Sequence, residues 1–254
     1  MTVLLGIDFE TSGLNPETDR ITEFGAILWT TDGDVQLDLF SSLVYHDKLE
    51  LSEEITNLTG ITTEMIRSIY TKPIGYCIQT LVGMMHSCDY CVAHNAEFDR
   101  NFFFHELVRL GFYDDNERRR LQNIPWIDTV TDVPYRTKGS RSLGYLCADH
   151  GFLNPFPHRA LYDVASMQKL VAQYDFNQIL KWHTSNTVEL AAVGLPFDRK
   201  DEARNLGFYW NAQAKVWTKK MKQVVYEQIE FEIPFEVKVR TIPYQWEKNT
   251  HAAS

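Results

Sequence analysis

Two acidic residues lie two positions apart at the end of a short apolar run. Residues 3–7 are apolar or glycine, which favours a buried strand, and Asp8 and Glu10 follow at its end. Because side chains alternate along a strand, both carboxylates would lie on one face and Phe9 on the other. Converging carboxylates are costly to bury unless a cation binds them, and hard cations such as Mg²⁺ prefer oxygen ligands. The pair indicates a metal site, although a solvated strand end explains it equally well.

A third acidic residue, Asp99, lies where the chain is predicted to leave a strand and enter a helix. It would then project from the first helical turn toward the edge of the sheet. The alternative is an acid that interacts favourably with the helix dipole, with His94 and Asn95 serving only the turn and the cap.

His158 and Asp163 form a further pair of candidate site residues, five positions apart. On one continuous helix, five residues turn through ~500°, so the two side chains would not share a face. Pro155 and Pro157 indicate instead that His158 lies on a loop before the helix that carries Asp163. From that loop His158 could reach the site that Asp163 reaches from the helix. The alternative is a surface histidine and an acid in a first turn.

Together these segments resemble the DnaQ-like, or DEDDh, exonuclease family, which has the ribonuclease H-like fold. Three motifs carry the resemblance in the family's order: Asp-Phe-Glu-Thr-Ser-Gly-Leu at 8–14, His-Asn-Ala-Glu-Phe-Asp at 94–99 and His-Arg-Ala-Leu-Tyr-Asp at 158–163. Shorter matches at 60–62, 127–129 and 142–146 support it, so the resemblance covers residues 1–178. Three spaced motifs in order are far more specific than any one of them.

The resemblance implies a role for each of these residues. Asp8, Glu10, Asp99 and Asp163 would hold two Mg²⁺ ions, for which Mn²⁺ could substitute. Two such ions would stabilise the charge on the phosphate and on the attacking and leaving oxygens. His158 would be the general base, since a histidine can take a proton from water near neutral pH.

Five residues match family positions beside the terminal nucleotide: Thr11, Leu14, His94, Asn95 and Phe98. Phe98 could stack on a base, but packing of its helix against the core is the favoured interpretation. Residues 136–141 form a basic loop that could hold the phosphates of the strand, and a solvated loop is an equally good interpretation.

The elements that must position these residues follow from hydrophobic patterns and turn signals. Strands are predicted at 3–7, 20–30, 35–44, 90–93 and 126–128, with a tight turn at Asp32-Gly33, and helices at 96–110 and 163–174. Gly111 would end the first of these helices. This order predicts an α/β fold over residues 1–180: a ribonuclease H-like three-layer domain with a mixed five-stranded sheet.

Residues 195–245 are predicted to form a small C-terminal α+β module. It looks like a module appended to some phage and plasmid DNA-processing proteins. A short helix is expected at 200–206, closed by Gly207, followed by a hairpin that carries Trp210 and Trp217. Seven basic and three acidic residues lie between 196 and 225, and basic residues interleaved with tryptophan suit binding of a single strand. The favoured alternative is that both tryptophans form the core of the module.

The formal net charge of −9 argues against attachment to nucleic acid through a broad positive surface. Metal ions in an acidic site would supply the positive charge instead. No apolar run approaches the ~20 residues of a membrane span, and the N-terminus lacks the basic region of a signal peptide. We therefore expect a cytoplasmic protein without a membrane partner.

The combined expectation is a metal-dependent 3′→5′ exonuclease that releases nucleoside 5′-monophosphates from nucleic acid with a free 3′ end. DNA is favoured over RNA on the strength of the appended module alone. Two alternatives stay open: an exoribonuclease on the same fold, and a proofreading or accessory subunit that acts mainly through a polymerase partner. The sequence does not indicate the oligomeric state or a preference for single strands or duplex ends.

Overall fold

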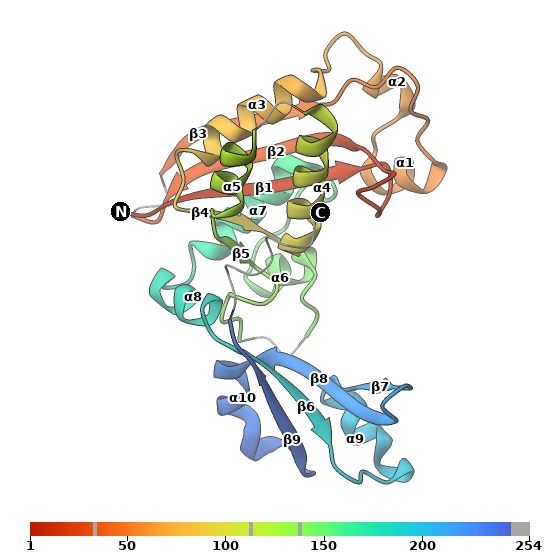
Figure 1. Cartoon of the computed structure of the whole chain (residues 1–254), viewed down its shortest axis with the longest axis vertical. Coiled ribbons are helices and arrows are strands. Elements are labelled where there is room, and N and C mark those ends of the chain that lie inside the picture. Colours follow the sequence, from red (N-terminus) through yellow and green to blue (C-terminus); the bar gives the residue numbers. More distant parts are fainter. Residues whose placement is uncertain (33–34, 112–113, 137–138, 245–254) are drawn as a thin grey trace.

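The structure, a computed structural model, describes residues 1–32, 35–111, 114–136 and 139–244. Gly33 of the predicted hairpin turn and residues 137–138 of the predicted basic loop lie outside these ranges. The described residues form two separate β-sheets, one of five strands and one of four (Figure 1).

The five-stranded sheet has the strand order β3-β2-β1-β4-β5, and it is mixed, as the sequence predicts. Its strands are β1 (Val3–Thr11), β2 (Ile21–Thr30), β3 (Gln36–Leu43), β4 (Tyr90–Ala93) and β5 (Trp126–Asp128). The first three form an antiparallel meander, whereas β4 pairs in parallel with β1, and β5 in parallel with β4. The carboxyl ends of β1, β4 and β5 therefore meet at one edge, which is where loops of parallel strands build sites.

Helices cover both faces of this sheet and complete the three layers (Figure 1). One face packs against α3 (Ile74–Met85), α4 (Ala96–Leu110) and α5 (Asp115–Gln122), and the other against α6 (Leu143–Asp149), α7 (Ala160–Val171) and α8 (Phe176–His183). Two short helices, α1 (Glu53–Thr59) and α2 (Thr63–Ile66), lie in the connection between β3 and α3. The two apolar clusters beneath these helices hold the α/β fold together.

Local sequence signals predict α4 well and α7 less well. Helix α4 has the predicted bounds, and Gly111 ends it in the left-handed conformation with its N–H bonded to the Leu107 carbonyl. Helix α7 begins three residues earlier than predicted, at Ala160, and ends at Val171. No side chain near Arg159 caps this helix; instead the Ala160 N–H donates to the carboxylate of Glu23 on β2, at 3.1 Å. A cap supplied from a distant strand leaves no signal in the local sequence.

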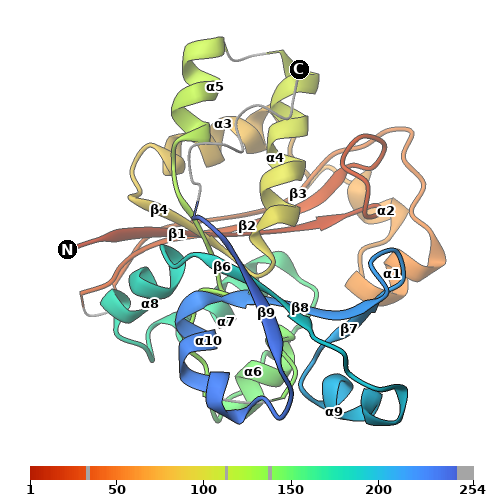
Figure 2. The same ribbon diagram turned by 60° about the horizontal axis from the view of Figure 1, so that its bottom comes forward.

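The second sheet is antiparallel, in the order β7-β8-β6-β9, and belongs to a C-terminal unit that lies beside α6 and α8 (Figure 2). Its elements are β6 (Thr187–Ala192), η1 (Phe197–Arg199), α9 (Lys200–Asn205), β7 (Tyr209–Asn211), β8 (Val216–Lys222), α10 (Gln223–Ile229), η2 (Glu230–Glu232) and β9 (Val237–Ile242). Strand β6 lies between β8 and β9, so this sheet begins before residue 195, where the sequence places the boundary.

The predicted short helix and hairpin of the C-terminal unit are both present. Gly207 follows α9 with a φ of 76°, and Trp210 pairs with Trp217 across β7 and β8. Trp217 packs against the small apolar cluster of this unit. Trp210 is 50% exposed, so the interpretation that both tryptophans form the core is wrong for Trp210. Its strand lies at the edge of the sheet and has only one neighbour to pack against.

Among the described residues, no helix is long and apolar enough to cross a membrane.

Candidate active site

The end of β1 presents two carboxylates on one face of the sheet. Phe9 points to the face covered by α3 and α4, where its ring lies 4.7 Å from that of Phe24. Asp8 and Glu10 alternate with Phe9 and therefore face α7. Glu10 is 8% exposed and lies opposite Glu23 of β2, whereas Asp8 is half-buried and lies opposite Gly25.

Two glycines let α7 approach these strands closely. A Cβ atom on Gly25 would lie 2.3 Å from the carbonyl carbon of Ala160, and one on Gly6 would lie 2.7 Å from the side chain of Val164. Both distances are shorter than any ordinary carbon contact. The missing side chains thus bring the first turn of α7, with Asp163, down onto the carboxylates of β1.

Asp163 is 9% exposed and is held by the loop that precedes its helix. Its two carboxylate oxygens accept hydrogen bonds from the amide of Asn154, at 2.5 Å, and from the backbone N–H of His158, at 3.1 Å. His158 lies outside α7, as predicted; it is exposed and has a φ of 60°. Ligand atoms of Glu10, His158 and Asp163 all lie within 4.8 Å of one another, close enough to share one cation.

Asp99 reaches the same corner from the first turn of α4. It is 2% exposed, and one of its oxygens accepts the backbone N–H of Phe9 at 3.0 Å. This bond ties the start of α4 to the end of β1. The five predicted residues Asp8, Glu10, Asp99, His158 and Asp163, from four separate segments, are thus brought to one edge of the sheet.

The carboxylates of this corner hold their protons more tightly than isolated acids do. Burial raises the pKa of Asp8 well above its ordinary value, and the charges of Asp99, Asp163 and Glu10 raise it further. Burial, then the charges of Asp163 and Glu23, raise the pKa of Glu10 to about 8. Burial raises the pKa of Asp163 to about 6, although its two hydrogen bonds oppose the change. Clustered acids that disfavour their own ionisation are suited to binding cations.

Glu23 is a buried carboxylate of the site that the sequence analysis did not single out. It is 2% exposed and forms a two-pronged ion pair with Arg159, with the shortest N–O distance 2.7 Å. Because Glu23 also caps α7, it both neutralises Arg159 and fixes the helix that carries Asp163. A single charged residue inside a strand that is otherwise uncharged and buried was the available signal.

Asp128, at the end of β5, appears in the sequence analysis only within a supporting motif. Its carboxylate accepts the backbone N–H groups of Asn95 and Val130, at 3.0 and 2.9 Å. Burial raises its pKa, and its charge in turn raises the pKa of Asp99. Asp128 therefore shapes the turn between β4 and α4 from beside the carboxylate cluster.

The predicted nucleotide-contacting residues lie at or after the ends of β1 and β4, two neighbouring parallel strands. Thr11 is buried, with its hydroxyl donating to the Gly13 carbonyl at 2.6 Å, whereas Leu14 is 83% exposed. His94 lies 2.8 Å from the Thr129 hydroxyl, and the exposed Asn95 has a φ of 74°. Phe98 is half-buried, with its ring 4.8 Å from that of Phe102, so it packs against the core of the α4 face.

Known proteins are similar to this chain in sequence and in fold. A family model described as an exonuclease, that of ribonuclease T, matches residues 5–171. The chain belongs to this exonuclease family. A second family model, a domain of unknown function, matches residues 191–239.

The exonuclease domain is similar to parts of two longer bacterial proteins. It is 35% identical over 160 residues to the PolC-type DNA polymerase III of Thermotoga petrophila, covering 62% of this chain and 11% of that protein. Over a longer stretch that includes the C-terminal unit, the chain is 27% identical over 236 residues to the 3′-5′ exonuclease DinG of Staphylococcus aureus, covering 90% of this chain and 24% of that protein. The chain thus spans only a small part of these relatives.

Solved structures share the fold at lower identity. The nuclease domain of 3′hExo, a DEDDh family member bound to rAMP, has a TM-score of 0.55 and 18% identity, covering 68% of this chain and 90% of that one. Exonuclease I of E. coli in complex with a dA16 oligonucleotide has a TM-score of 0.60 and 18% identity, covering 76% of this chain and 48% of that one. Together with the family match, these likenesses show that the domain has the fold of DEDDh 3′-exonucleases.

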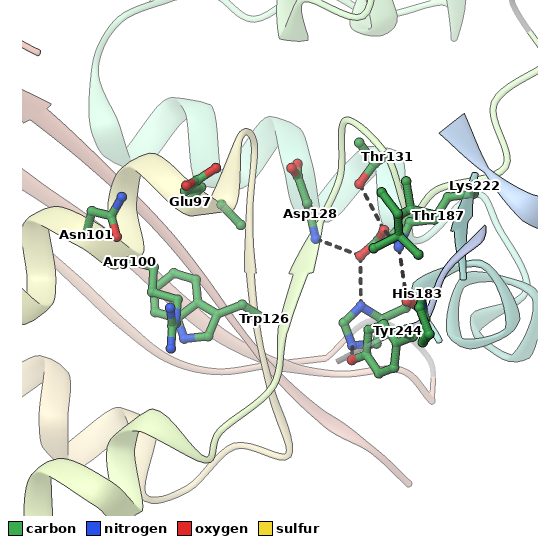
Figure 3. A pocket seen from close by; sticks show the side chains of 14 residues that line it. Glu97, Arg100, Asn101, Trp126, Asp128, Thr131, His183, Thr187, Lys222 and Tyr244 are labelled. Carbon is green, nitrogen blue, oxygen red and sulfur yellow. Dashed lines mark hydrogen bonds and ion pairs between the residues drawn. The ribbon is translucent and has the colours of Figure 1, made fainter. Parts of the chain in front are cut away.

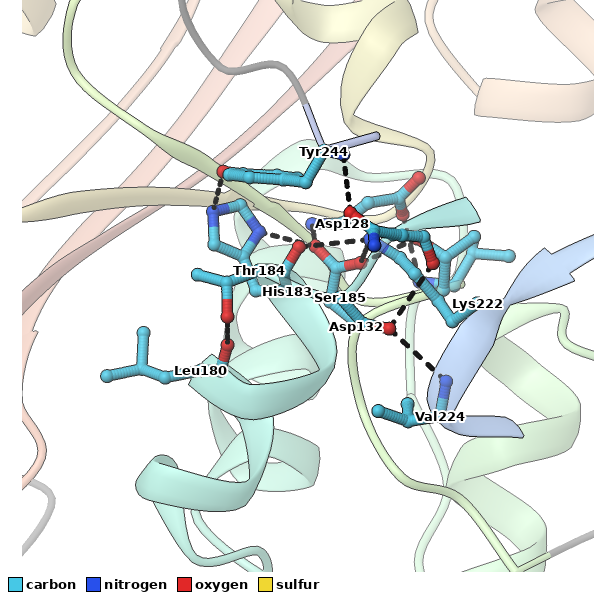
Figure 4. Close-up of polar contacts among 12 residues, drawn as sticks. Asp128, Asp132, Leu180, His183, Thr184, Ser185, Lys222, Val224 and Tyr244 are labelled. Atoms are coloured by element: carbon cyan, nitrogen blue, oxygen red, sulfur yellow. Dashed lines mark hydrogen bonds and ion pairs between the residues drawn. The ribbon is translucent and has the colours of Figure 1, made fainter. Parts of the chain in front are cut away.

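A polar network joins the exonuclease domain to the C-terminal unit. A cavity of about 570 Å³ lies at this junction, with Arg100 and Trp126 on one side and Lys222 and Tyr244 on the other (Figure 3). In its wall, the buried His183 lies 2.8 Å from both the Asp132 carboxylate and the Tyr244 hydroxyl (Figure 4).

Lys222 of β8 completes this network. Its ammonium lies 2.9 Å from Asp132 and donates to the carbonyl of His183 at 3.1 Å. Burial tends to raise the pKa of Asp132, but the hydrogen bond to His183 and the charge of Lys222 hold that pKa below its ordinary value. Asp132 is therefore a carboxylate held in its charged form, which fixes the second sheet against the exonuclease domain.

Proposed function

We propose that this protein removes nucleotides one at a time from the free 3′ ends of DNA by hydrolysing phosphodiester bonds and releasing nucleoside 5′-monophosphates. The observation that carries the proposal is the cluster of Asp8, Glu10, Asp99 and Asp163, whose pKa values are all raised. Such a cluster is unfavourable by itself and becomes favourable when cations bind it.

The donor set fits divalent metal ions of the hard type. All four acidic side chains offer oxygens, the ligands that Mg²⁺ prefers, and Mn²⁺ accepts the same set. We propose two Mg²⁺ ions, held by Asp8, Glu10, Asp99 and Asp163. When bound, the ions supply positive charge that stabilises the phosphate and the leaving oxygen.

His158 is proposed as the general base that takes a proton from the attacking water. Its exposed side chain lies beside Glu10 and Asp163, on a loop that Asp163 itself anchors. The loop sets the position of the imidazole without burying it, so the ring is accessible to water. The same closeness would also allow His158 to be a metal ligand, and an experiment below separates the two roles.

The terminal nucleotide is proposed to lie against Thr11, Leu14, His94, Asn95 and Phe98. Leu14 supports this role because an 83% exposed leucine beside a polar site offers a free apolar surface to a base. Phe98 would contribute through the edge of its half-buried ring, since its other contacts are to the core.

DNA is proposed as the substrate because of the relatives' functions. The PolC-type relative is a DNA polymerase, and the exonuclease I structure holds a deoxyribonucleotide strand. The PolC match also supports a second candidate role, in which this domain acts beside a polymerase.

Digestion of end-labelled substrates tests the proposal. Single-stranded and duplex DNA and RNA of one sequence, each labelled at the 5′ end, would be incubated with Mg²⁺. We expect DNA to be shortened from its 3′ end with release of nucleoside 5′-monophosphates. Faster shortening of RNA would overturn the choice of DNA, and activity that appears only after addition of a polymerase would favour the second role.

A further inference from the structure

A second groove between the two units carries a concentration of positive charge. It has a volume of about 890 Å³ and lies between the loop that precedes α6, helix α8, and the β8–α10 part of the C-terminal unit. Arg136, Arg141 and Lys181 line it from the exonuclease domain, and Lys219 from β8. Glu232 is an acidic member of the lining. This excess of positive charge stands out in a chain whose net charge is −9.

Much of the positive charge of the C-terminal unit is neutralised within the unit or at the junction. Arg199 pairs with Glu202 at 2.7 Å, and Arg204 with Asp201 at 3.3 Å. Lys222 is used in the buried pair with Asp132 described above. Fewer basic side chains of residues 196–225 are therefore available to bind an external anion than the composition of this segment indicates.

The cations of the groove are engaged differently. The ion pairs among described residues involve none of Arg136, Lys181 and Lys219. Lys219 donates to the Leu206 carbonyl at 2.5 Å, and burial lowers its pKa. Arg141 lies over the ring of Tyr135, 5.0 Å from its centroid. Cations held in place by neutral partners keep their attraction for an anion.

The groove begins beside the candidate active site. Burial lowers the pKa of His94, which precedes α4 and Asp99, and the nearby backbone of Arg141 opposes this effect. Arg136 and Lys181 line the groove from the exonuclease domain, and Lys219 lines it from β8 of the C-terminal unit. Trp182 also lines the groove and is half-buried, so it adds an aromatic surface among the cations.

We propose that this groove binds the phosphate backbone of a single nucleic-acid strand, several nucleotides away from the 3′ end that the active site holds. This inference rests on the proposed function. Cations contributed by both units suit a flexible chain of phosphates, and an aromatic surface suits unstacked bases. The groove, rather than the Trp210–Trp217 hairpin, then supplies the affinity for long strands.

The test is the salt dependence of binding by a double variant, Arg136→Ala with Lys181→Ala. Both side chains are exposed, so their removal leaves the core intact. The probe is a fluorescein-labelled dT20 strand in buffer with EDTA, which prevents metal-dependent cleavage. Two lost phosphate contacts should flatten the slope of log K against log salt by ~1.4, at ~0.7 per contact. The relative affinity of the variant should then be about 25-fold lower at 0.1 M than at 1 M salt.

A matched control removes the same charge from exposed positions of the C-terminal unit, outside the groove. Lys215→Ala with Lys238→Ala changes two exposed lysines outside the groove, the first in the turn of the tryptophan hairpin. The control should keep the wild-type slope. The proposal would be overturned if the groove variant kept the wild-type slope, or if the control flattened the slope by as much as the groove variant does. If the double variant melts at a lower temperature, Lys181→Ala alone gives the same test with a change of ~0.7.

Cleavage of a dinucleotide with Mg²⁺ separates this proposal from the proposed function. A dinucleotide held at the active site would reach only the Arg141 end of the groove, so the variant of Arg136 and Lys181 should cleave it at the wild-type rate. If the variant lost dinucleotide cleavage as strongly as it lost binding of dT20, the two residues would belong to the active site. That result would overturn the proposal of a separate strand-binding groove. A wild-type protein that binds dT20 with the expected slope but cleaves nothing would refute the proposed function alone.

Discussion

At the scale of single residues, the site is a set of acids placed in an unfavourable environment. Glu10 and Asp99 are almost completely buried, and each lies near other carboxylates. Their positions were predictable because each lies in a short local motif. Glu23 and Asn154 were not, because their roles depend on partners that the fold brings together; Glu23 lies 136 residues from Arg159.

The raised pKa of Glu10 predicts how the metal-free protein responds to pH. The ordinary pKa of this group is 4.5 and the folded value is about 8, so the folded state binds more protons between these values. Its contribution to stability is fully present below pH 4.5 and is lost as the pH rises through about 8. The melting temperature in EDTA should therefore fall between pH 5 and pH 8.

Two comparisons sharpen this measurement. Glu10→Gln removes the titrating group and should flatten the fall, and Mg²⁺ should raise the melting temperature more at pH 8 than at pH 6, because it displaces protons. A melting temperature in EDTA that rises over this range for the wild type would contradict the electrostatic description of the site.

The role of His158 can be separated from that of the carboxylates. His158→Ala should lower the turnover rate by about 10²–10⁴-fold, the usual contribution of a general base. Metal affinity should be nearly unchanged, as measured by calorimetric titration with Mn²⁺. Loss of a Mn²⁺ site in the variant would instead make His158 a ligand, which its closeness to Glu10 and Asp163 allows.

At the scale of elements, the parts that the sequence predicts best are those with local signals. Strands β4 and β5 and helix α4 have the predicted bounds because short apolar runs and Gly111 mark them. Helix α7 is predicted three residues late because Glu23, a residue of β2, caps it. The close approach of α7 to β2 depends on the absence of a side chain at Gly25, which only the packed structure explains.

Gly25→Ala should therefore displace Asp163 from the active site, although Gly25 itself is not a site residue. The added methyl group meets the backbone of α7, so the helix has to move away and carry Asp163 with it. We expect a loss of roughly 1–3 kcal/mol in the free energy of unfolding and about 10²-fold in cleavage rate.

Gly83→Ala is the matched control for this variant. Gly83 is exposed within α3, and no atom lies within 4 Å of an added Cβ. An alanine there should raise stability by roughly 0.5–1 kcal/mol and leave the cleavage rate unchanged. Chemical denaturation and a dinucleotide assay measure both quantities. Wild-type activity in Gly25→Ala would mean that the contact between α7 and β2 does not position Asp163.

At the scale of the whole molecule, the chain consists of an exonuclease domain and a C-terminal unit fixed to it by the network of Asp132, His183, Lys222 and Tyr244. Composition alone placed the boundary at 195, since basic and aromatic residues become frequent there. Composition does not reveal that β6, at Thr187–Ala192, is the strand that β8 and β9 both pair with.

The position of a truncation should therefore decide whether the exonuclease domain can be isolated. Removing residues 195–254 leaves β6 without both neighbours and exposes Val188 and Leu190, which are now buried. That product should aggregate through the free strand. Removing residues 186–254 should give a monomer that cleaves dinucleotides at the full rate. Gel filtration and the dinucleotide assay compare the two, and a monomeric, active 195–254 deletion would contradict this boundary.

The most direct test of the account is cleavage of a linear and a circular single strand of the same DNA sequence with Mg²⁺. We expect the linear strand, labelled at its 5′ end, to give a ladder of shortening products, while the circle stays intact. Asp8→Ala should reduce this cleavage by at least about 10³-fold, since a proposed ligand of the metal ions that stabilise the transition state is lost. Asp38→Ala, on the exposed edge strand β3, should have no effect. Three results would contradict the proposal of a 3′→5′ exonuclease with Asp8 in its active site. They are cleavage of the circle, release of the 5′ label as the first product, and wild-type activity of Asp8→Ala.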